Sequence, residues 1–320
     1  MRLGVLDVGS NTVHLLVVDA HRGAHPMPTR SEKTVLRLAE RITPDGRLSK
    51  IGAEELVETV NAAKRSAEAL GCEEMMAFAT SAVREANNAG DVLDFVADKT
   101  GVELRVLSGE DEARFTFLAA RRWYGWSAGR LLVLDIGGGS LEIATGFDED
   151  PTLAVSLPLG AGRLTRKRFS SDPPQRKDIE ETTEWLADEL APVAKKIHKL
   201  GEPDRAVATS KTFRSLARLT GAAPSSAGSR VRRALTDTGL RQLLAFVSRM
   251  SAADLAELEG VSPSRAHQLL AGALVAQATM KALSLTELEI CPWALREGVI
   301  LRRLDHTDGA GQTGTAQNGG

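Results

Sequence analysis

The chain has 320 residues, of which 42% are hydrophobic and 26% are charged, so it is long enough to bury a sizeable core and to divide into about two domains. Its 40 basic and 42 acidic side chains leave a formal net charge of -2, which excludes a protein whose whole surface is built to bind nucleic acid. Asp7, Asn11 and His14 interrupt the apolar N-terminal run, and no run reaches the about 18 apolar residues that a membrane span requires. We therefore expect a cytoplasmic protein with neither a nucleic-acid nor a membrane partner.

The first half of the sequence opens with strands and continues with a helix. β-Branched and apolar residues predict strands over Leu3–Val8 and Val13–Asp19, joined by a short turn. Apolar residues then recur at helical spacing over Ala53–Leu70, and a further apolar run predicts a strand over Met75–Ala79. This order, a hairpin followed by a helix and a returning strand, predicts a mixed sheet.

The second half repeats this order. Strands are predicted over Leu131–Ile136 and Leu141–Gly146, a helix over Ile179–Leu200 and a returning strand over Ala206–Thr209. Helical patterns dominate from Leu240 to Leu283. The sequence therefore predicts an α/β protein made of two similar halves.

Two pairs of short segments indicate that the halves are copies of one another. Val5–Asn11 resembles Val133–Gly139 at an offset of 128 residues, and Ala77–Ser81 resembles Ala206–Ser210 at an offset of 129. An isolated coincidence does not explain two matches at nearly the same offset, so we infer a duplicated domain. The long period excludes a solenoid, whose repeats span about 20–50 residues.

Composition suggests where the domains end. We expect one domain over residues 1–126 and a second over residues 127–305, with the boundary near Gly125 and Gly129. The last segment, residues 306–320, has few apolar residues and five glycines. A segment of that composition cannot bury enough apolar surface to fold, so we predict a disordered tail.

A carboxylate stands near the end of the first strand of each hairpin, followed by small residues in a tight turn. Glycine lets the backbone N–H groups of such a turn approach an anion closely, and the carboxylate can hold a cation that neutralises phosphate charge. A plain hairpin turn explains either turn alone, but the pair at a fixed offset favours two phosphate-binding turns. The residues are Asp7, Gly9, Ser10 and Asn11 in the first copy and Asp135, Gly137, Gly138, Gly139 and Ser140 in the second.

Three further motifs carry ionisable groups. Glu142 comes two residues after Ser140, so strand alternation returns its side chain toward Asp135. Arg84 follows the end of a predicted strand, where its guanidinium suits a phosphate and equally a surface salt bridge. The acidic triplet Glu110–Glu112 opens a predicted helix, and acids favour helix N-termini in any case because of the helix dipole. The triplet alone is therefore ambiguous.

In combination, these motifs resemble those of the exopolyphosphatase and guanosine pentaphosphate phosphatase family, within the actin/hexokinase-like superfamily. The resemblance runs from Arg2 to about Leu304, and the order and spacing of its motifs are specific. It implies an α/β fold of two duplicated actin-like (ribonuclease H-like) domains, with mixed sheets flanked by helices and the active site in the interdomain cleft. The matching stretches are Asp7–Asn11, Ala79–Arg84, Gly109–Ala113, Asp135–Glu142, Leu157–Ala161 and Leu295–Val299.

The resemblance also implies roles for the residues in these motifs. Glu112 is the implied general base for the attacking water, and Arg84 the implied ligand of the terminal phosphate. Asp7, Asp135 and Glu142 are implied to hold Mg²⁺ or position water, while the two glycine turns hold phosphoryl oxygens. These roles suit phosphoryl transfer, which needs an oriented water and donors for the developing charge, and little covalent chemistry from the protein.

The chain departs from the family pattern at two places. Many members carry a Gly-Gly-Thr-Ala turn where this chain has Ser210-Lys211-Thr212-Phe213. Lys211 brings a cation to that altered turn, and we expect it to bind substrate phosphate. The usual Arg-Ala-Asp becomes Arg265-Ala266-His267, which removes an acid. The chain resembles the short, two-domain form of the family.

The sequence therefore predicts an Mg²⁺-dependent exopolyphosphatase that removes terminal phosphate from inorganic polyphosphate, with short to medium chains favoured. The alternative is a guanosine pentaphosphate (pppGpp) 5′-phosphohydrolase with the same site, and whether (p)ppGpp is a substrate or an inhibitor stays open. A small-molecule kinase of the same superfamily fits less well, because the water-activating acidic motif and the altered Ser210-Lys211-Thr212 turn oppose it. A non-catalytic phosphate sensor of the same fold also fits less well, because binding alone requires no general base. The family often forms dimers, so we expect a homodimer.

Basic clusters in the second half bear on the length of the substrate. A single cluster is usually a solvated face that balances acids elsewhere. Clusters that border the site would instead attract a polyanionic chain. The clusters are Arg163, Arg166, Lys167 and Arg168; Lys195, Lys196 and Lys199; and Arg230, Arg232 and Arg233.

Overall fold

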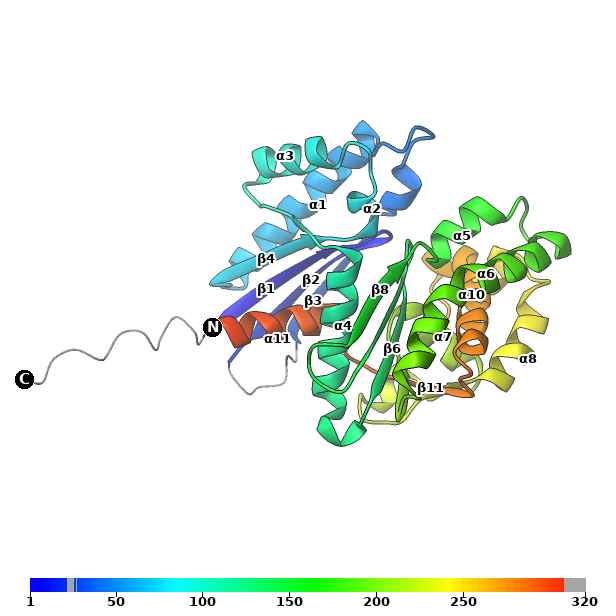
Figure 1. Ribbon diagram of the computed structural model, residues 1–320. Coiled ribbons are helices and arrows are strands. Elements are labelled where there is room, and N and C mark those ends of the chain that lie inside the picture. The colour runs from blue at the N-terminus through cyan, green and yellow to red at the C-terminus, as the bar shows by residue number, and fades with distance from the viewer. Residues whose placement is uncertain (22–25, 27, 308–320) are drawn as a thin grey trace, which may run out of the picture. The chain divides into compact units, whose positions relative to one another are not determined.

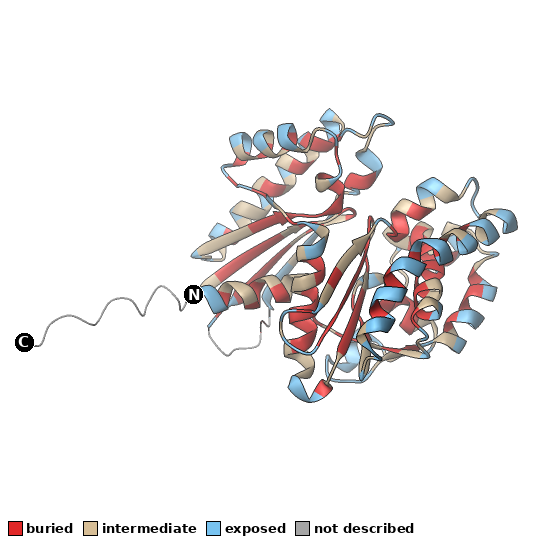
Figure 2. Ribbon diagram, viewed as in Figure 1, coloured by how far each residue is buried: buried red, intermediate tan, exposed pale blue. Residues whose placement is uncertain are grey.

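The computed structural model describes residues 1–21, 26 and 28–307 (Figure 1). The chain packs into two compact units. The first comprises Met1–Leu107 together with the segment that begins at Leu295, and the second comprises Ser108–Ala294. In each unit the buried residues line the central strands and the inner faces of the helices, while the outer helix faces are exposed (Figure 2).

The first unit is built on a five-stranded mixed sheet. Its elements are β1 (Arg2–Val8), β2 (Thr12–Asp19), β3 (Pro28–Val35), η1 (Leu38–Arg41), α1 (Lys50–Ala69), β4 (Glu74–Ala79), α2 (Ser81–Arg84), α3 (Ala89–Thr100), β5 (Arg105–Val106) and α11 (Leu295–Thr307). The strand order is β3-β2-β1-β4-β5. β1, β2 and β3 pair antiparallel, whereas β4 runs parallel to β1 and β5 runs parallel to β4.

β1 is buried on both of its faces. Leu6 and Val8 pack in one core cluster with Leu56 of α1. Leu3 and Val5 alternate with them and so point to the opposite face, where they are also fully buried. α11 packs against β1 on the side of the sheet opposite α1 and α3 (Figure 1). Two covered faces explain why β1 is a nearly continuous apolar run.

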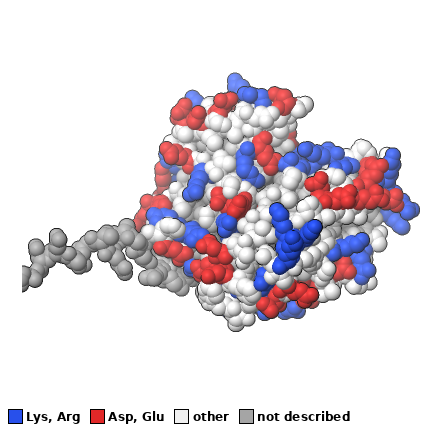
Figure 3. All heavy atoms as spheres, viewed as in Figure 1, with Lys and Arg blue, Asp and Glu red and all other residues white. Residues whose placement is uncertain are grey.

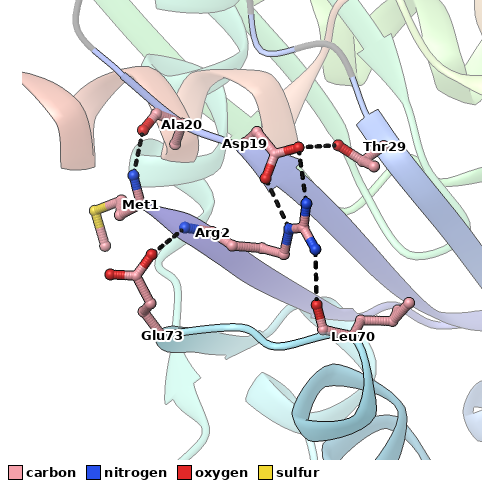
Figure 4. Close-up of polar contacts among 7 residues, drawn as sticks. All are labelled: Met1, Arg2, Asp19, Ala20, Thr29, Leu70 and Glu73. Atoms are coloured by element: carbon pink, nitrogen blue, oxygen red, sulfur yellow. Dashed lines mark hydrogen bonds and ion pairs between the residues drawn. The ribbon is translucent and has the colours of Figure 1, made fainter.

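The N-terminal residues tie β1 to its neighbours (Figure 4). The ammonium group of Met1 donates to the carbonyl of Ala20 at 3.0 Å. The Arg2 guanidinium donates to both carboxylate oxygens of Asp19, at 2.7 and 3.1 Å, and to the carbonyl of Leu70 at 3.0 Å. The hydrogen bonds from Arg2 and then from Thr29 hold the pKa of Asp19 below its usual value. Because the pair is exposed it adds little stability, and it links two residues that face each other at one end of the β1–β2 pairing.

The second unit is built on a six-stranded mixed sheet. Its strands are β6 (Leu131–Ile136), β7 (Leu141–Gly146), β8 (Leu153–Leu157), β9 (Arg205–Ala208), β10 (Ala234–Thr236) and β11 (Glu287–Ile290). The strand order is β10-β11-β9-β6-β7-β8. β6, β7 and β8 pair antiparallel, β9 runs parallel to β6 and β11, and β10 is antiparallel to β11.

Helices cover this second sheet. They are α4 (Gly109–Tyr124), α5 (Ala161–Arg168), α6 (Arg176–Leu200), α7 (Lys211–Leu219), α8 (Asp237–Val247), α9 (Ala252–Ala256) and α10 (Leu269–Ala282), with short 3-10 helices η2 (Trp126–Ala128), η3 (Ser225–Ala227) and η4 (Pro263–Gln268). α10 contacts α5, α6, α7 and α8. Its side chains are apolar almost all round, as expected for a helix enclosed by others.

The predicted elements of both halves are present in the structure. The helix predicted over Ala53–Leu70 is α1, and the helix predicted over Ile179–Leu200 is α6. The β1–β2 hairpin with parallel β4 is matched by the β6–β7 hairpin with parallel β9. Two mixed sheets flanked by helices are therefore confirmed, and the same order of pairing in each supports the duplication.

The division between the units differs from the predicted domain boundary after residue 126. α4 precedes that boundary but lies in the second unit, where it packs against β7 and β8 and buries Phe117 and Leu118. The glycines at 125 and 129 mark only the connection between α4 and β6. α4 belongs to the second unit because its buried face packs on β7 and β8, which come later in the sequence.

The C-terminal helix also changes the predicted division. The sequence predicts residues 295–305 in the second domain, but α11 lies in the first unit. There Arg303 donates to both carboxylate oxygens of Glu74 in β4, at 2.9 and 2.7 Å. α11 extends to Thr307, so the first two residues of the predicted tail are helical. Residues 308–320 of that tail lie outside the described residues.

Other expectations from composition can be compared with the described residues. None of their helices is both long enough and apolar enough to cross a membrane. Cys291 is buried and Cys72 is half-buried, and neither forms a disulfide. Acidic and basic side chains are interspersed on the face shown in Figure 3, in keeping with the nearly balanced charge.

Candidate active site

The β6–β7 hairpin carries the predicted phosphate-binding turn of the second unit. Asp135 is the penultimate residue of β6. The turn that follows closes with a hydrogen bond from Gly137 N–H to the carbonyl of Ser140, at 2.9 Å. The residue preceding α5 packs directly on this turn, because a Cβ on Gly160 would collide with backbone atoms of Gly139 and Ser140. A residue with any side chain at position 160 would displace the turn.

The β1–β2 hairpin is the matching turn of the first unit. Gly9 N–H donates to the carbonyl of Thr12 at 3.0 Å. Ser10 and Asn11 are buried, and the Ser10 hydroxyl lies 2.7 Å from the hydroxyl of Ser81, the first residue of α2. The small polar residues of this turn are therefore held against the start of a helix, as the glycine turn of the second unit is.

Arg84 ends α2 beside the same edge of the first sheet. Thr80 precedes α2 and donates its N–H to the carbonyl of Val8 at 3.1 Å, which ties the helix to the end of β1. Arg84 is half-buried, and its Nη1 donates to the carbonyl of Leu107 at 2.9 Å. Because β1 and β4 are parallel, their carboxyl ends share one edge, and Asp7 and Arg84 lie near it.

One of the three acids at the start of α4 is buried. Glu110 is exposed and pairs with Arg114 at 2.7 Å. Asp111 accepts a hydrogen bond at 2.8 Å from Ser108, the N-cap residue. Glu112, in contrast, is only 8% exposed. Capping and the helix dipole account for the first two acids, and they leave the burial of Glu112 unexplained.

Glu112 lies near Glu142 of the β6–β7 hairpin, and Glu142 in turn lies near Asp135. Asp135 and Glu142 are direct cross-strand partners, so their side chains share one face of the sheet. Glu142 is 6% exposed and accepts a hydrogen bond at 2.8 Å from Ser156 Oγ. Burial, followed by repulsion from Glu112 and Asp135, raises the pKa of Glu142 well above its usual value. This group of carboxylates therefore favours a proton or a cation in its midst.

Positively charged side chains also act on Asp135. Burial raises the pKa of Asp135, opposed first by a hydrogen bond from Thr209 Oγ1 and then by the charges of Arg214 and Arg265. Burial and the same two arginines lower the pKa of Lys211. Lys211, Arg214 and Arg265 thus form a positive cluster beside Asp135, and a cluster of guanidinium and ammonium groups suits phosphate oxygens.

Arg214 and Arg265 are not among the site residues predicted from the sequence. Arg214 stands three positions after Lys211 in α7, a spacing that places both on one face of the helix, so a signal for it was present. Arg265 lies in η4, far along the chain from both. Only the packing of η4 in the second unit reveals its place.

The predicted site residues fall into two groups, one in each unit. Among residues 1–21, 26 and 28–307, no set of three or more His, Cys, Asp or Glu side chains is arranged to hold a metal ion by itself. A site in the cleft between the two domains stays a prediction. The first group is Asp7, Gly9, Ser10, Asn11 and Arg84, and the second is Glu112, Asp135, Gly137, Gly138, Gly139, Ser140, Glu142 and Lys211.

The sequence of residues 17–307 matches the Ppx/GppA phosphatase family. The chain belongs to this family. Exopolyphosphatase 1 of Mycobacterium tuberculosis (strain ATCC 25618 / H37Rv) is 64% identical over 305 residues, which cover 95% of this chain and 89% of the relative. Exopolyphosphatase 1 of Mycobacterium leprae (strain TN) is 62% identical over 305 residues, which cover 95% of this chain and 90% of the relative.

Crystal structures of family members share the fold. A Ppx/GppA family member from Aquifex aeolicus matches with a TM-score of 0.80 and 25% identity, over 96% of this chain and 99% of its own. An exopolyphosphatase from Cytophaga hutchinsonii ATCC 33406 matches with a TM-score of 0.86 and 23% identity, over 96% of this chain and 98% of its own. The predicted fold of two actin-like domains is therefore confirmed.

The two departures from the Ppx/GppA pattern have different structural settings. Ser210 has a φ of 54°, a left-handed conformation that favours glycine, which many family members carry at this turn. Its hydroxyl nevertheless caps α7 by accepting a hydrogen bond from Phe213 N–H at 3.4 Å. His267 lies in η4, with its Nε2 3.0 Å from the side-chain amide nitrogen of Gln268. Nothing in the structure explains the exchange of acid for histidine.

The raised pKa of Glu142 predicts how stability changes with pH. A carboxyl whose pKa is higher in the folded state stabilises the fold at a pH below its unfolded value, and this stabilisation is lost as pH rises through the folded value. The Glu142→Gln variant lacks that loss, so its Tm should exceed that of wild type increasingly as pH rises above the usual value of 4.5. Each 1 kcal/mol corresponds to roughly 2–4 °C.

Thermal unfolding of both proteins between about pH 5 and pH 8, in a metal chelator, measures this difference. Glu110→Gln is the matched control, because Glu110 is exposed and paired with Arg114, and its Tm should follow that of wild type. A Tm difference between Glu142→Gln and wild type that stays constant with pH would contradict the assignment.

Proposed function

We propose that the protein is an exopolyphosphatase that hydrolyses terminal phosphate from inorganic polyphosphate by attack of a water activated by Glu112. The observation that carries the proposal is the burial of Glu112 beside Glu142, the cross-strand partner of Asp135 at the glycine turn of the second unit. The family membership and the 64% identity to a relative named Exopolyphosphatase 1 support the choice of substrate.

Glu112 suits the role of general base better than its neighbours in the triplet. A base must be held in a fixed position at the reacting water. Glu110 is exposed and bound to Arg114, and Asp111 is engaged with the cap of α4. Glu112 is buried and held by the first turn of a helix whose other residues pack on β7 and β8.

Positive groups and backbone amides supply the rest of the chemistry. Phosphoryl transfer relies on donors that neutralise charge on the phosphoryl oxygens. In the second unit the Gly137–Ser140 turn would bind these oxygens, and Lys211 with Arg214 and Arg265 would hold the following phosphates. In the first unit Arg84 and the Gly9–Asn11 turn would bind further oxygens of the terminal phosphate.

The donors present fit Mg²⁺ bound together with substrate. Mg²⁺ prefers carboxylate oxygens, and it commonly takes one or two of them while phosphates and waters complete its shell. This preference agrees with the structure, in which Asp135 and Glu142 are cross-strand partners. The described residues contain no group of three or more His, Cys, Asp or Glu side chains that could hold a metal ion. Asp135, Glu142 and Asp7 would hold the ion, which when bound would neutralise phosphate charge. Burial and then repulsion from Glu112 and Asp135 raise the pKa of Glu142, and the ion would also relieve this repulsion.

The pppGpp phosphohydrolase alternative requires a pocket for a nucleoside. A cavity of about 420 Å³ in the second unit is lined by Lys211, Arg214, Arg218 and Arg233 among others, and this observation keeps the alternative open. Arg233 donates to four backbone carbonyls, three of which belong to residues that line the cavity, and Arg218 pairs with Glu259. These two arginines therefore form part of the cavity wall. Their guanidinium groups are less available to bind a phosphate than the ammonium group of Lys211.

A cytoplasmic location, a homodimer and an effect of (p)ppGpp also belong to the proposal. They rest on the family resemblance and on composition. Light scattering coupled to gel filtration measures the oligomeric state directly, and a monomer would remove the dimer from the proposal.

Glu112→Gln should abolish polyphosphate hydrolysis while binding persists, because the amide keeps the shape of the carboxylate but accepts no proton near neutral pH. We expect kcat to fall at least about 100-fold, measured as released phosphate. Glu110→Gln is the control and should keep wild-type turnover. Equal losses in the two variants, or full turnover in Glu112→Gln, would reject Glu112 as the base.

Asp135→Asn should raise the Mg²⁺ concentration for half-maximal rate about tenfold or more, because one charged oxygen ligand of a hard cation is removed. EDTA should silence the wild type. A second readout is thermal unfolding, in which Mg²⁺ should raise the Tm of the wild type more than that of Asp135→Asn. Full hydrolysis in EDTA would remove the metal from the proposal.

The basic cluster on α5 tests polymer against nucleotide as substrate. Arg166 and Lys167 are exposed, whereas the Arg168 guanidinium stacks on Trp185 at 3.8 Å from the ring centroid. Neutralising Arg166 and Lys167 together should weaken long polyphosphate more than short chains. It should also reduce the salt dependence by roughly one unit of slope for each phosphate group that the variant no longer neutralises.

Arg168→Gln is the control, because it removes one positive charge from the same helix, at a side chain that is already engaged with Trp185. The substrates to compare are short polyphosphate, long polyphosphate and pppGpp. A kcat/KM for pppGpp well above that for every polyphosphate length, unaffected by the double variant, would favour the nucleotide phosphohydrolase.

A further inference from the structure

The carbonyl side of the Gly137–Ser140 turn is held by the start of α5. Ala161 N–H donates to the carbonyl of Gly137 at 3.0 Å, and Arg163 N–H donates to that of Gly138 at 2.9 Å. The carbonyl of Gly139 accepts from Arg163 Nε at 2.8 Å and from the backbone N–H of Gly160 at 3.2 Å. Three consecutive carbonyls of the turn therefore point toward α5.

Because peptide groups are planar, the bonds to these carbonyls also set the direction of the N–H groups of the turn. In a trans peptide the C=O of one residue and the N–H of the next point in opposite directions, and these peptides are trans. Holding the carbonyls of Gly137, Gly138 and Gly139 toward α5 directs the N–H groups of Gly138, Gly139 and Ser140 away from it. Successive N–H groups that point the same way form an anion-binding concavity.

The amides so directed are available for a ligand. Within the part of the chain that the structure describes, the N–H groups of Gly138 and Gly139 donate to no protein acceptor. Glycines adopt many backbone conformations and do not hold such an arrangement by themselves. The orientation must therefore come from the groups that bind the carbonyls.

We infer that Arg163 is a positioning residue of the phosphate-binding turn. Its Nε–H···O=C bond to Gly139 fixes the Gly139–Ser140 peptide and so the direction of the Ser140 N–H. The other bonds to the turn come from backbone groups of Gly160, Ala161 and Arg163, which a substitution at 163 leaves in place. The hydrogen bond from Nε is thus the contact with the turn that a substitution of the Arg163 side chain removes. The inference rests on the proposed function of this turn.

Three substitutions separate positioning from direct attraction of substrate. Arg163→Gln places an amide nitrogen at the same number of bonds from Cα as the arginine Nε, so it keeps a donor but loses the charge. Arg163→Lys keeps the charge but has no donor at that place. Arg163→Met keeps the length of the stem and loses both.

Steady-state hydrolysis of a defined short polyphosphate should then order the variants. We expect kcat to fall about tenfold or more in Arg163→Met and Arg163→Lys, with KM within about threefold of wild type, since misdirected donors mainly lose transition-state stabilisation. Arg163→Gln should retain most of the kcat. Activity kept in Arg163→Lys but absent in Arg163→Gln, or kept in all three variants, would overturn the inference.

Hydrogen–deuterium exchange gives a readout that does not depend on turnover. Amide exchange over residues 137–142 should be faster in Arg163→Met than in wild type and should return toward wild type in Arg163→Gln. The control is Arg166→Met, which removes a neighbouring exposed arginine and should leave that exchange unchanged. If the wild type hydrolyses no polyphosphate, the proposed function fails while the exchange result still decides the role of Arg163.

Discussion

The close approach of backbone to backbone at the glycine turn of the second unit constrains much of the site around it. Gly160 packs against the Gly139–Ser140 peptide with no room for a side chain, so α5 must begin at that place. The start of α5 then holds the carbonyls of the turn. Direct contact between two backbone segments is rigid, because no side-chain rotamer can absorb a displacement. A loop of three glycines, flexible by itself, thereby acquires a fixed direction for its N–H groups.

Electrostatic repulsion among buried carboxylates is the second feature on which function would rest. Glu112 and Glu142 are nearly inaccessible to water, and Asp135 stands opposite Glu142 in the sheet. Such a group is unfavourable for stability by itself, as the raised pKa of Glu142 indicates. The nearby charges of Arg214 and Arg265 offset part of the cost at Asp135. Proteins retain arrangements of this kind where a proton or a cation must be held during a reaction.

Both units use one plan, a hairpin whose first strand also pairs in parallel with a strand reached through a helix. The plan places the turn of each hairpin and the end of the parallel strand at one sheet edge. In the first unit that edge carries Asp7 and Arg84, and in the second it carries Asp135 and Lys211. The copies differ at the altered turn, where Ser210 takes a positive φ and still caps α7.

The sequence by itself determined the repeated order of strands and helices, because the alternation of apolar residues is a local property. It also located the two turns, since Asp7–Asn11 and Asp135–Ser140 are contiguous motifs. Only the tertiary structure decided that α4 and α11 pack on strands distant in sequence, that Glu112 is the buried acid of its triplet, and that Arg168 stacks on Trp185. The reason is physical, because the periodicity of apolar residues reveals which face of an element is buried but not which element packs against that face. The contacts of Arg163 and Arg265 likewise form between residues that are far apart in the sequence, and no local pattern connects them.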